Sequence, residues 1–425
     1  MVAKAPATTM KTKSEMKDDV GEGNTLPEES DVVLQLAQKL CLLRVPPMAG
    51  MSGAGGKGEG GGEAGVVNGP RVSLASVQEE LLELGMAKKY VAMCEQFEQM
   101  ADAEKVESVH ASNAAREKEL DAAIADAEEN LGEVEVRDAM LAKAVFLRGV
   151  GESERAETLF KETEEKTAAV GQKMDMLFML LRTSMAEGDW AAVKKLLQRA
   201  KQLFEEGGDW ERKNRLKVYE GVHALATRQF KRAAELFLDS ITTFTSTEIF
   251  DYTSLVFYAV ITSLVSLDRV TLKKKVVDSP EVRSVIGKVP HLEELVHSLY
   301  DCKYGGYLKA MLGISDSIYY NMYLHPHFRY TIRELRVVGY AQFLESYRSV
   351  TISSMATSFG VSVDFLDKEI STFICRGRLG CKIDRVAGII ETVRPDGKNA
   401  SYQQVIKDGD FLLNRVQKLS KVIEL

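Results

Sequence analysis

The sequence has no hydrophobic run long enough to cross a membrane. Its longest uncharged stretch, residues 252–267, has 16 residues and includes Thr and Ser, whereas a membrane-spanning helix needs about 20 mainly apolar residues. The first residues, MVAKAPATTMKTKSEMKDD, also lack the apolar block of a secretion signal. We therefore expect residues 252–267 to form a buried helix, and we expect no membrane partner.

Cysteines are few and irregularly placed. The five are odd in number and never spaced as C-x-x-C: Cys41, Cys94, Cys302, Cys375 and Cys381. Such a set indicates neither a disulfide framework nor a zinc site. We expect reduced thiols in a reducing compartment.

The chain also lacks an excess of positive charge. Its formal net charge is −7, with 28% charged and 45% hydrophobic residues. This composition is typical of a globular protein with a substantial core, and an acidic balance argues against phosphate-backbone binding as the main activity. We expect no nucleic-acid partner.

Motifs that carry chemistry are missing or incomplete. Neither a G-x-S-x-G elbow nor an H-E-x-x-H zinc motif occurs. Gly53, Gly55 and Gly58 fit G-x-G-x-x-G, but no strand precedes them and glycine dominates the surrounding run. His325 and His327 form an isolated H-x-H without a third ligand nearby. The sequence therefore predicts no catalytic residue, cofactor or metal ion.

Residues 72–321 are typical of α-helices joined by short turns, because only Pro280 and Pro290 interrupt them. The segments GVGESERAETLFKE, EGDWAAVKKLLQRA and TRQFKRAAELFLDS each contain a turn followed by an amphipathic helix. Their matching apolar pairs are 37 and 40 residues apart: Leu159/Phe160, Leu196/Leu197 and Leu236/Phe237. Such periods predict helical-hairpin repeats that stack into a solenoid resembling tetratricopeptide repeats.

After residue 330 the pattern changes. RELRVVGYAQFLESY, TISSMATSFG and VDFLDKEISTFICRG are typical of three helices. GCKIDRVAGIIETVRP is typical of two short strands, with Ile383, Val386, Ile389 and Ile390 among its strand-forming residues. This order predicts a winged helix.

The last segment, YQQVIKDGDFLLNRVQKLSKVIEL, predicts an amphipathic helix with a coiled-coil-like stripe. Five apolar residues recur at steps of seven, four and three: Val405, Leu412, Val416, Leu419 and Ile423. A stripe of this kind at a chain end needs partner helices.

Winged helices often bind DNA through their second helix, which then carries basic or amide side chains. Here that helix contains Asp364, Asp367 and Glu369 against Lys368, with Arg376 only after its end. These charges favour protein–protein packing over DNA binding.

Several long sequence segments carry a resemblance that is more specific than the order of helices and strands. EEGGDWERKNRLKVYEG, LESYRSVTISSMATSFGVSVDFLDKEI and GDFLLNRVQKLSKVI closely resemble the PCI-domain subunits of the proteasome's non-ATPase lid, in the family known as regulatory particle subunit seven. The similarity runs from about Leu74 to the C-terminus. A related PCI subunit of the signalosome is the alternative within this class, and a winged-helix nucleic-acid-binding protein is the alternative of a different class.

The resemblance implies a structural subunit, without catalytic residues, of the 26S proteasome regulatory-particle lid, which supports assembly and ubiquitin-dependent protein degradation. It implies a hetero-oligomer with other PCI lid subunits, with the metal-bearing deubiquitinase subunit and with the ATPase base, in the cytoplasm and nucleus. Interface roles then fall on the wing residues Ile383, Val386 and Ile389 and on the C-terminal stripe.

Four regions are expected in this mainly α protein. They are a flexible N-terminal arm (1–72), a helical-repeat solenoid (73–329), a PCI winged helix (330–397) and a C-terminal bundle helix (398–425). The arm departs from the family through a Gly-rich linker between Pro46 and Pro70. It also contains a short amphipathic helix with Leu36, Leu40 and Leu43 on one side, which we expect to dock onto the body.

Overall fold

The structure is a computed structural model that describes residues 31–45, 73–207, 209–393 and 397–423. The expected Gly-rich linker and the glycines at 53, 55 and 58 lie outside these residues. Within the described ranges no helix is long and apolar enough to cross a membrane. The longest uncharged stretch forms the buried helix α11 (Tyr252–Ser266), as its composition predicts.

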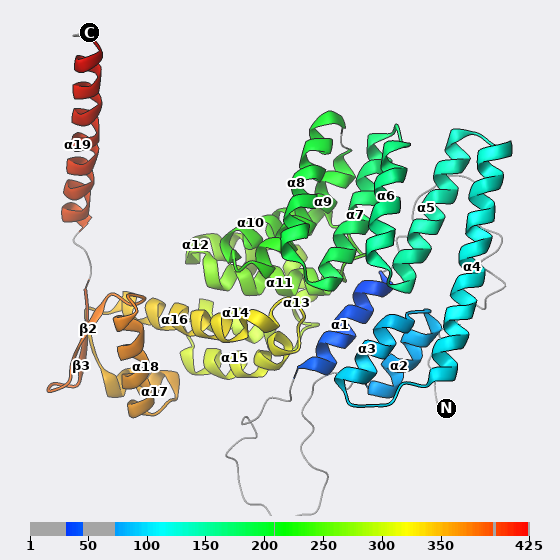
Figure 1. Cartoon of the computed structure of the whole chain (residues 1–425). Helices are drawn as coiled ribbons and strands as arrows, with labels where there is room; N and C mark the ends of the chain where they lie inside the picture. Colours follow the sequence, from blue (N-terminus) through cyan, green and yellow to red (C-terminus); the bar gives the residue numbers. More distant parts are fainter. Residues whose placement is uncertain (1–30, 46–72, 208, 394–396, 424–425) are drawn as a thin grey trace, which may run out of the picture.

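Helices make up most of the described chain (Figure 1). The N-terminal part contains α1 (Val32–Arg44), α2 (Leu74–Glu83), α3 (Ala87–Gln96) and α4 (Ala103–Asn130). The repeats follow as α5 (Glu133–Val150), α6 (Ser153–Glu165), α7 (Val170–Glu187), α8 (Trp190–Gly207), α9 (Trp210–Ala226), α10 (Phe230–Ser240), the 3₁₀ turn η2 (Ile241–Thr243) and α11. Helices next to each other in sequence pack together, as in a solenoid.

The remaining helices lead to the C-terminal module, the winged-helix region formed by α16, α17, α18 and the three strands. They are α12 (Arg269–Leu272), the π turn η3 (Lys273–Val277), α13 (Pro280–Ile286), α14 (Leu292–Tyr300), α15 (Tyr304–Tyr319), the 3₁₀ turn η4 (His325–His327), α16 (Phe328–Ser346), α17 (Ile352–Phe359) and α18 (Val363–Cys375). The three short strands are β1 (Ser349–Thr351), β2 (Cys381–Asp384) and β3 (Ile389–Thr392), and α19 (Gly397–Ile423) follows them.

The hairpins follow the predicted repeat. The three apolar pairs fall on α6, α8 and α10, and in each pair the second member is buried: Phe160, Leu197 and Phe237. The turns before these helices contain residues with left-handed backbone at Gly151 (φ 89°), Gly188 (φ 78°) and Arg228 (φ 63°). Glycine adopts this conformation without steric cost, and Gly151 and Gly188 end the helices α5 and α7.

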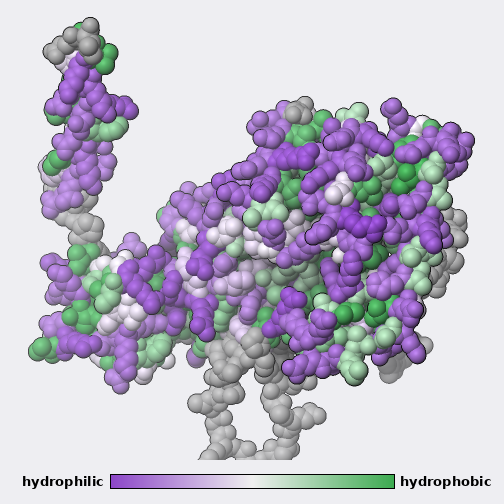
Figure 2. Space-filling model, in the orientation of Figure 1, coloured by the Kyte–Doolittle hydropathy of each residue, from purple (hydrophilic) through white to green (hydrophobic). Residues whose placement is uncertain are grey.

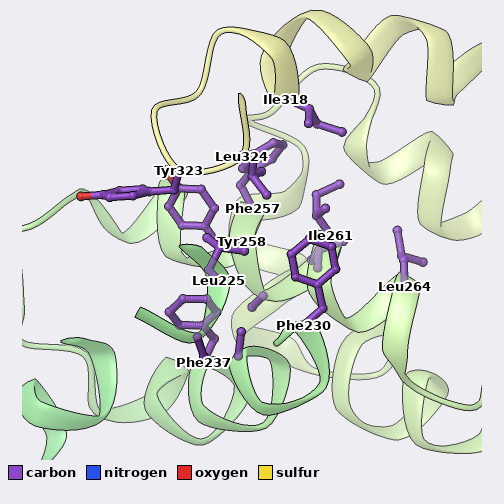
Figure 3. Close-up of a cluster of buried hydrophobic side chains, with 14 of the residues drawn as sticks. Leu225, Phe230, Phe237, Phe257, Tyr258, Ile261, Leu264, Ile318, Tyr323 and Leu324 are labelled. Atoms are coloured by element: carbon purple, nitrogen blue, oxygen red, sulfur yellow. The ribbon is translucent and has the colours of Figure 1, made fainter. Parts of the chain in front are cut away.

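Aromatic residues join the solenoid to the C-terminal module (Figure 3). The Tyr258 ring on α11 lies 6.2 Å from that of Phe237 and 6.0 Å from that of Tyr323. The Asn321 amide donates a 2.7 Å hydrogen bond to the Tyr258 hydroxyl, which satisfies this buried polar group. One hydrophobic core therefore continues from the repeats into the C-terminal module.

The short N-terminal helix α1 is packed against the body, as expected. Leu36 is buried, Leu40 and Leu43 are half-buried against the cluster formed with α2 and α3, and Leu34 belongs to the main core. At its start, Asp31 accepts a 3.0 Å hydrogen bond from the N–H of Val33, which caps the helix.

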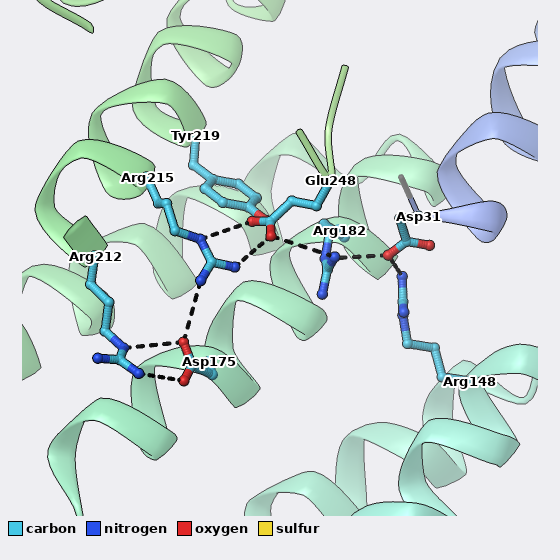
Figure 4. A network of polar contacts seen from close by, with 8 residues as sticks. All are labelled: Asp31, Arg148, Asp175, Arg182, Arg212, Arg215, Tyr219 and Glu248. Atoms are coloured by element: carbon cyan, nitrogen blue, oxygen red, sulfur yellow. Dashed lines mark hydrogen bonds and ion pairs between the residues drawn. The ribbon is translucent and has the colours of Figure 1, made fainter. Parts of the chain in front are cut away.

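A buried charge network surrounds this cap (Figure 4). The Asp31 carboxylate pairs with Arg148 and, at 3.2 Å, with Arg182. Nearby, Glu248 accepts hydrogen bonds from Arg215 and, at 2.7 Å, from Tyr219. Each carboxylate therefore meets cationic partners, as buried charges require.

The C-terminal module has the predicted helix order and one strand more than predicted. Its antiparallel sheet has the order β1-β3-β2. Ile383 on β2 pairs with Ile390 on β3, and Val350 on β1 pairs with Ile390 from the other side. The central strand is therefore β3, and β2 lies at one edge of the sheet.

The expectation that Val386 lies in a wing strand is wrong. Val386 is in the turn between β2 and β3 and is fully exposed. The Asp384 carboxylate accepts hydrogen bonds from the N–H groups of Val386 (2.9 Å) and Ala387 (3.2 Å). Gly388 then adopts φ 64°. Asp side chains stabilise turns in this way and compete with strand pairing.

Candidate protein-assembly interface

The C-terminal helix α19 projects away from the rest of the molecule (Figure 1). All of its residues from 401 to 423 are exposed. Figure 2 shows hydrophobic side chains among the hydrophilic ones along this helix. An isolated helix gains most of its stability from packing an apolar face, and α19 presents such a face without a partner among the described residues.

The five stripe residues lie on this exposed helix as the sequence predicts. Their side chains are between 60% and 75% exposed: Val405, Leu412, Val416, Leu419 and Ile423. Tyr402 is also exposed and extends the stripe by one step. The sequence prediction does not include it, although it lies three residues before Val405 and so fits the spacing of three and four residues. The role of these residues as an interface remains a prediction.

The wing offers a second surface. The N–H of Val393 donates a 2.8 Å hydrogen bond to the carbonyl of Gly380, so these residues form a hydrogen-bonded pair. Because backbone groups alternate along an antiparallel strand, those of Cys381 and Ile383 point away from β3. Among the described residues no further strand pairs with β2, so its edge presents backbone groups of the kind that bind another strand.

Of the wing residues expected to form the interface, Ile383 and Ile389 lie in strands and are partly buried. Ile383 packs against the core of the module. Its side chain therefore supports the wing, while its backbone lies at the edge. Ile389 faces Thr351 on one side and Asp384 on the other, so its backbone is inside the sheet.

Two acidic side chains of α18 are engaged within the module. Glu369 pairs with Arg336 on α16 at 2.5 Å and accepts a 2.6 Å hydrogen bond from Tyr340. Asp367 pairs with Arg385 of the wing at 3.1 Å. These contacts hold α18 against α16 and the wing, so the two carboxylates have a structural role.

The two histidines of the H-x-H pair form hydrogen bonds with the backbone. Nδ1 of His325 lies 2.7 Å from the carbonyl of Tyr319, and Nε2 of His327 lies 2.7 Å from that of Ala226. Arg228 donates to Nδ1 of His327 at 3.3 Å, which fits a proton on Nε2. The described residues contain no group of three or more His, Cys, Asp and Glu side chains suited to a metal ion.

Three family descriptions match separate parts of the chain. "26S proteasome subunit RPN7" matches residues 102–275, "PCI domain" matches 314–394, and "26S proteasome regulatory subunit RPN7/PSMD6 C-terminal helix" matches 402–423. The "26S proteasome non-ATPase regulatory subunit 6 homolog" of Arabidopsis thaliana is 54% identical over 360 residues, which are 84% of this chain and 93% of the relative. The chain belongs to the RPN7 family of proteasome regulatory subunits.

Other relatives agree with this assignment. The "26S proteasome regulatory subunit RPN7" of Saccharomyces cerevisiae is 40% identical over 318 residues, 74% of each chain. The "COP9 signalosome complex subunit 1" of Arabidopsis thaliana is only 27% identical, over 46% of this chain. Membership of the RPN7 family is therefore favoured over membership of the signalosome subunit family. The RPN7 C-terminal helix match covers the whole apolar stripe of α19.

Proposed function

We propose that this chain is a structural, non-catalytic subunit of the proteasome regulatory-particle lid, where it supports assembly and ubiquitin-dependent protein degradation. The observation that carries the proposal is α19, an exposed helix with a continuous apolar stripe that an RPN7-specific description matches. The relatives are named as proteasome regulatory subunits, which supports a place within a larger complex.

Burial of the stripe supplies the driving force for assembly. Fully burying a Val, Leu or Ile side chain contributes about 1.5–3 kcal/mol, so five such residues contribute roughly 7–15 kcal/mol before the entropic cost of association. A multi-helix bundle offers this burial through knobs-into-holes packing. The β2 edge adds a second contact, because a strand from a neighbouring PCI subunit can extend the wing.

The partners that fit these surfaces are other PCI lid subunits, and the lid also contains the metal-bearing deubiquitinase subunit and adjoins the ATPase base. The proposal assigns the chain to the cytoplasm and nucleus as part of a hetero-oligomer. It assigns no reaction to this chain itself. The RPN7 family membership supports a place among the subunits of a proteasome complex.

The test is a double substitution in the stripe, Leu412→Asp with Leu419→Asp. We expect this variant to be lost from complexes purified through another lid subunit, because two buried carboxylates are costly in a helix bundle. The free chain should keep its thermal unfolding transition, since residues 401–423 of α19 are exposed.

The matched control is Asn414→Asp with Gln417→Asp, which makes the same charge change on the other side of α19. We expect the control to assemble normally. Normal co-purification of the Leu412→Asp/Leu419→Asp variant would refute the proposal, and equal loss of both variants would show that charge alone blocks assembly.

A further inference from the structure

A basic groove lies between α16 and α18, away from the α19 stripe. It is open, has a volume of about 590 Å³ and is lined on one side by residues of α16 and on the other by residues of α18. On α16 the lining residues follow one helical face, from Arg329 through Ile332 and Arg333 to Arg336. On α18 they follow another, from Phe365 to Phe373, and Arg376 comes directly after the helix ends.

The charge of the groove is strongly positive. Five cationic side chains and a single carboxylate line it: Arg329, Arg333, Arg336, Lys368, Arg376 and Glu369. The carboxylate of Glu369 is already neutralised by Arg336 and bound by Tyr340. Cations concentrated along one cleft raise the local concentration of an anionic ligand.

Three of these cations have no acidic partner. Arg329, Lys368 and Arg376 are exposed, and among the described residues no carboxylate forms an ion pair with them. By contrast, Arg333 pairs with Glu334 at 3.2 Å. The three unpaired cations lie on both walls of the groove and are free to pair with an incoming acidic group.

The floor of the groove is apolar, and one aromatic side chain joins the cations at its rim. Ile332 is half-buried and Phe373 is buried among the lining residues, whereas Phe365 is 44% exposed. A hydrophobic floor with a charged rim is the usual composition of a protein-docking groove. A nucleic-acid backbone would match the cations but would leave the apolar floor unused.

We propose that the α16–α18 groove is a docking site for an acidic peptide segment of a partner protein, in which Asp and Glu side chains alternate with aliphatic or aromatic anchors. The acidic groups pair with Arg329, Lys368 and Arg376, and an apolar anchor packs against Phe365. This site is separate from α19 and from the β2 edge, and it does not depend on the proposed assembly through either of them.

The experiment measures binding of a fluorescent peptide to the full chain by anisotropy. The probe is a short peptide rich in Asp and Glu that carries Leu and Phe. The comparison peptide has Asn and Gln at the acidic positions, and a DNA duplex of equal charge is the third ligand. We expect the acidic peptide to bind, with affinity that falls as salt rises, and the neutral peptide and the duplex to bind at least about tenfold more weakly, a difference of about 1.4 kcal/mol.

Two pairs of variants locate the site. Replacing Arg329, Lys368 and Arg376 together by Ala should weaken binding about tenfold, since three exposed ion pairs, each of modest strength, are lost. The matched control replaces three exposed cations outside the groove, Lys195, Lys288 and Lys309, by Ala. It should bind the acidic peptide as tightly as the unaltered chain does. Phe365→Ala should also weaken binding, whereas Val363→Ala, on the same helix outside the groove, should not.

Several results would overturn the proposal. They are equal affinity of the groove and control triple variants, binding of the neutral peptide as tight as that of the acidic one, and tighter binding of the duplex. The last result would assign the groove to nucleic acid instead. Because the probe is a peptide and no lid subunit takes part, failure here leaves the α19 co-purification test unaffected.

Discussion

The backbone N–H of Asp31 donates a 3.1 Å hydrogen bond to the carbonyl of Glu248. This contact joins the first turn of α1 to the loop before α11, and the two side chains belong to one buried network through Arg182 (Figure 4). Burial and the adjacent Glu248 charge raise the pKa of Tyr219 well above its ordinary value of 10, so Tyr219 stays a hydrogen-bond donor. The attachment of α1 therefore depends on a few charged groups as well as on its leucines.

Replacing Asp31 by Asn should release α1 from the body. Asn keeps a capping oxygen, but Arg148 and Arg182 lose their carboxylate, and breaking a buried ion pair costs about 3–5 kcal/mol. Native-state hydrogen exchange of the amides in α1 measures this loss. Lys39→Ala, which removes a half-exposed pair of α1 with Glu80, is the control and should cost less than about 1 kcal/mol. Unchanged protection in Asp31→Asn would mean that apolar packing alone holds α1.

Gly221→Ala should destabilise the packing of α9 on α10. A Cβ at this position would lie 2.6 Å from Cε1 of the fully buried Phe237. Overpacking costs about 1–3 kcal/mol, which outweighs the gain of about 1 kcal/mol in helix propensity. We expect a lower urea midpoint for unfolding.

The control for this substitution is Gly149→Ala in α5, where, apart from the adjacent backbone of the helix itself, a Cβ would meet no atom of the described residues within 4 Å. This change should raise stability by up to about 1 kcal/mol. If Gly221→Ala is also stabilising, then Phe237 has room to move and the close approach of the two helices is not a constraint.

Much of the fold follows from local pattern in the sequence. The pairs Leu159/Phe160, Leu196/Leu197 and Leu236/Phe237 predict the hairpins because helical period and turn glycines act over short distances. The strand β1 could not be predicted in the same way, since Ser349–Thr351 is too short for alternation and becomes a strand only by pairing with β3. Val386 was misassigned because its β propensity is overridden by the Asp384 turn.

The same contrast between local and long-range pattern applies to the candidate sites. The α19 stripe was predictable because its residues share one helix and one period, although Tyr402 was overlooked. The basic groove could not be predicted from the sequence of α18, which is itself acidic. The positive charge comes largely from α16, which places Arg329, Arg333 and Arg336 beside α18. Likewise, nothing near Asp31 in sequence reveals Arg148 or Arg182. The four region boundaries remain predictions.

Acid should weaken the packing around α9 through His223. Burial, followed by the charge of Lys194, lowers the pKa of His223 below its ordinary 6.5, and Glu220 and Arg232 also act on it. The unfolded chain therefore binds a proton more readily than the folded one, so stability is present above pH 6.5 and is lost as the pH falls through the folded pKa. Urea unfolding at stepwise lower pH measures this slope.

His223→Gln removes the titrating group and should flatten the slope just below pH 6.5. At lower pH a second loss is expected from Glu220: although burial raises the pKa of its carboxyl, hydrogen bonds from Lys201 and Arg232 more than offset this and lower it. An unchanged slope in His223→Gln would contradict the assignment of the first loss to this histidine.

Ile383→Pro should test the wing edge without removing a hydrogen bond of the sheet. The N–H of Ile383 points away from β3, so proline removes a donor that makes no hydrogen bond inside the sheet. Ile383→Ala is the matched control, since it also removes the side chain but keeps the N–H group. We expect the proline variant to be depleted from lid complexes purified through another subunit, and the alanine variant to be retained. Equal retention of both would mean that no partner strand pairs with β2, whereas equal loss would mean that the partly buried side chain of Ile383, and not its backbone, supports assembly.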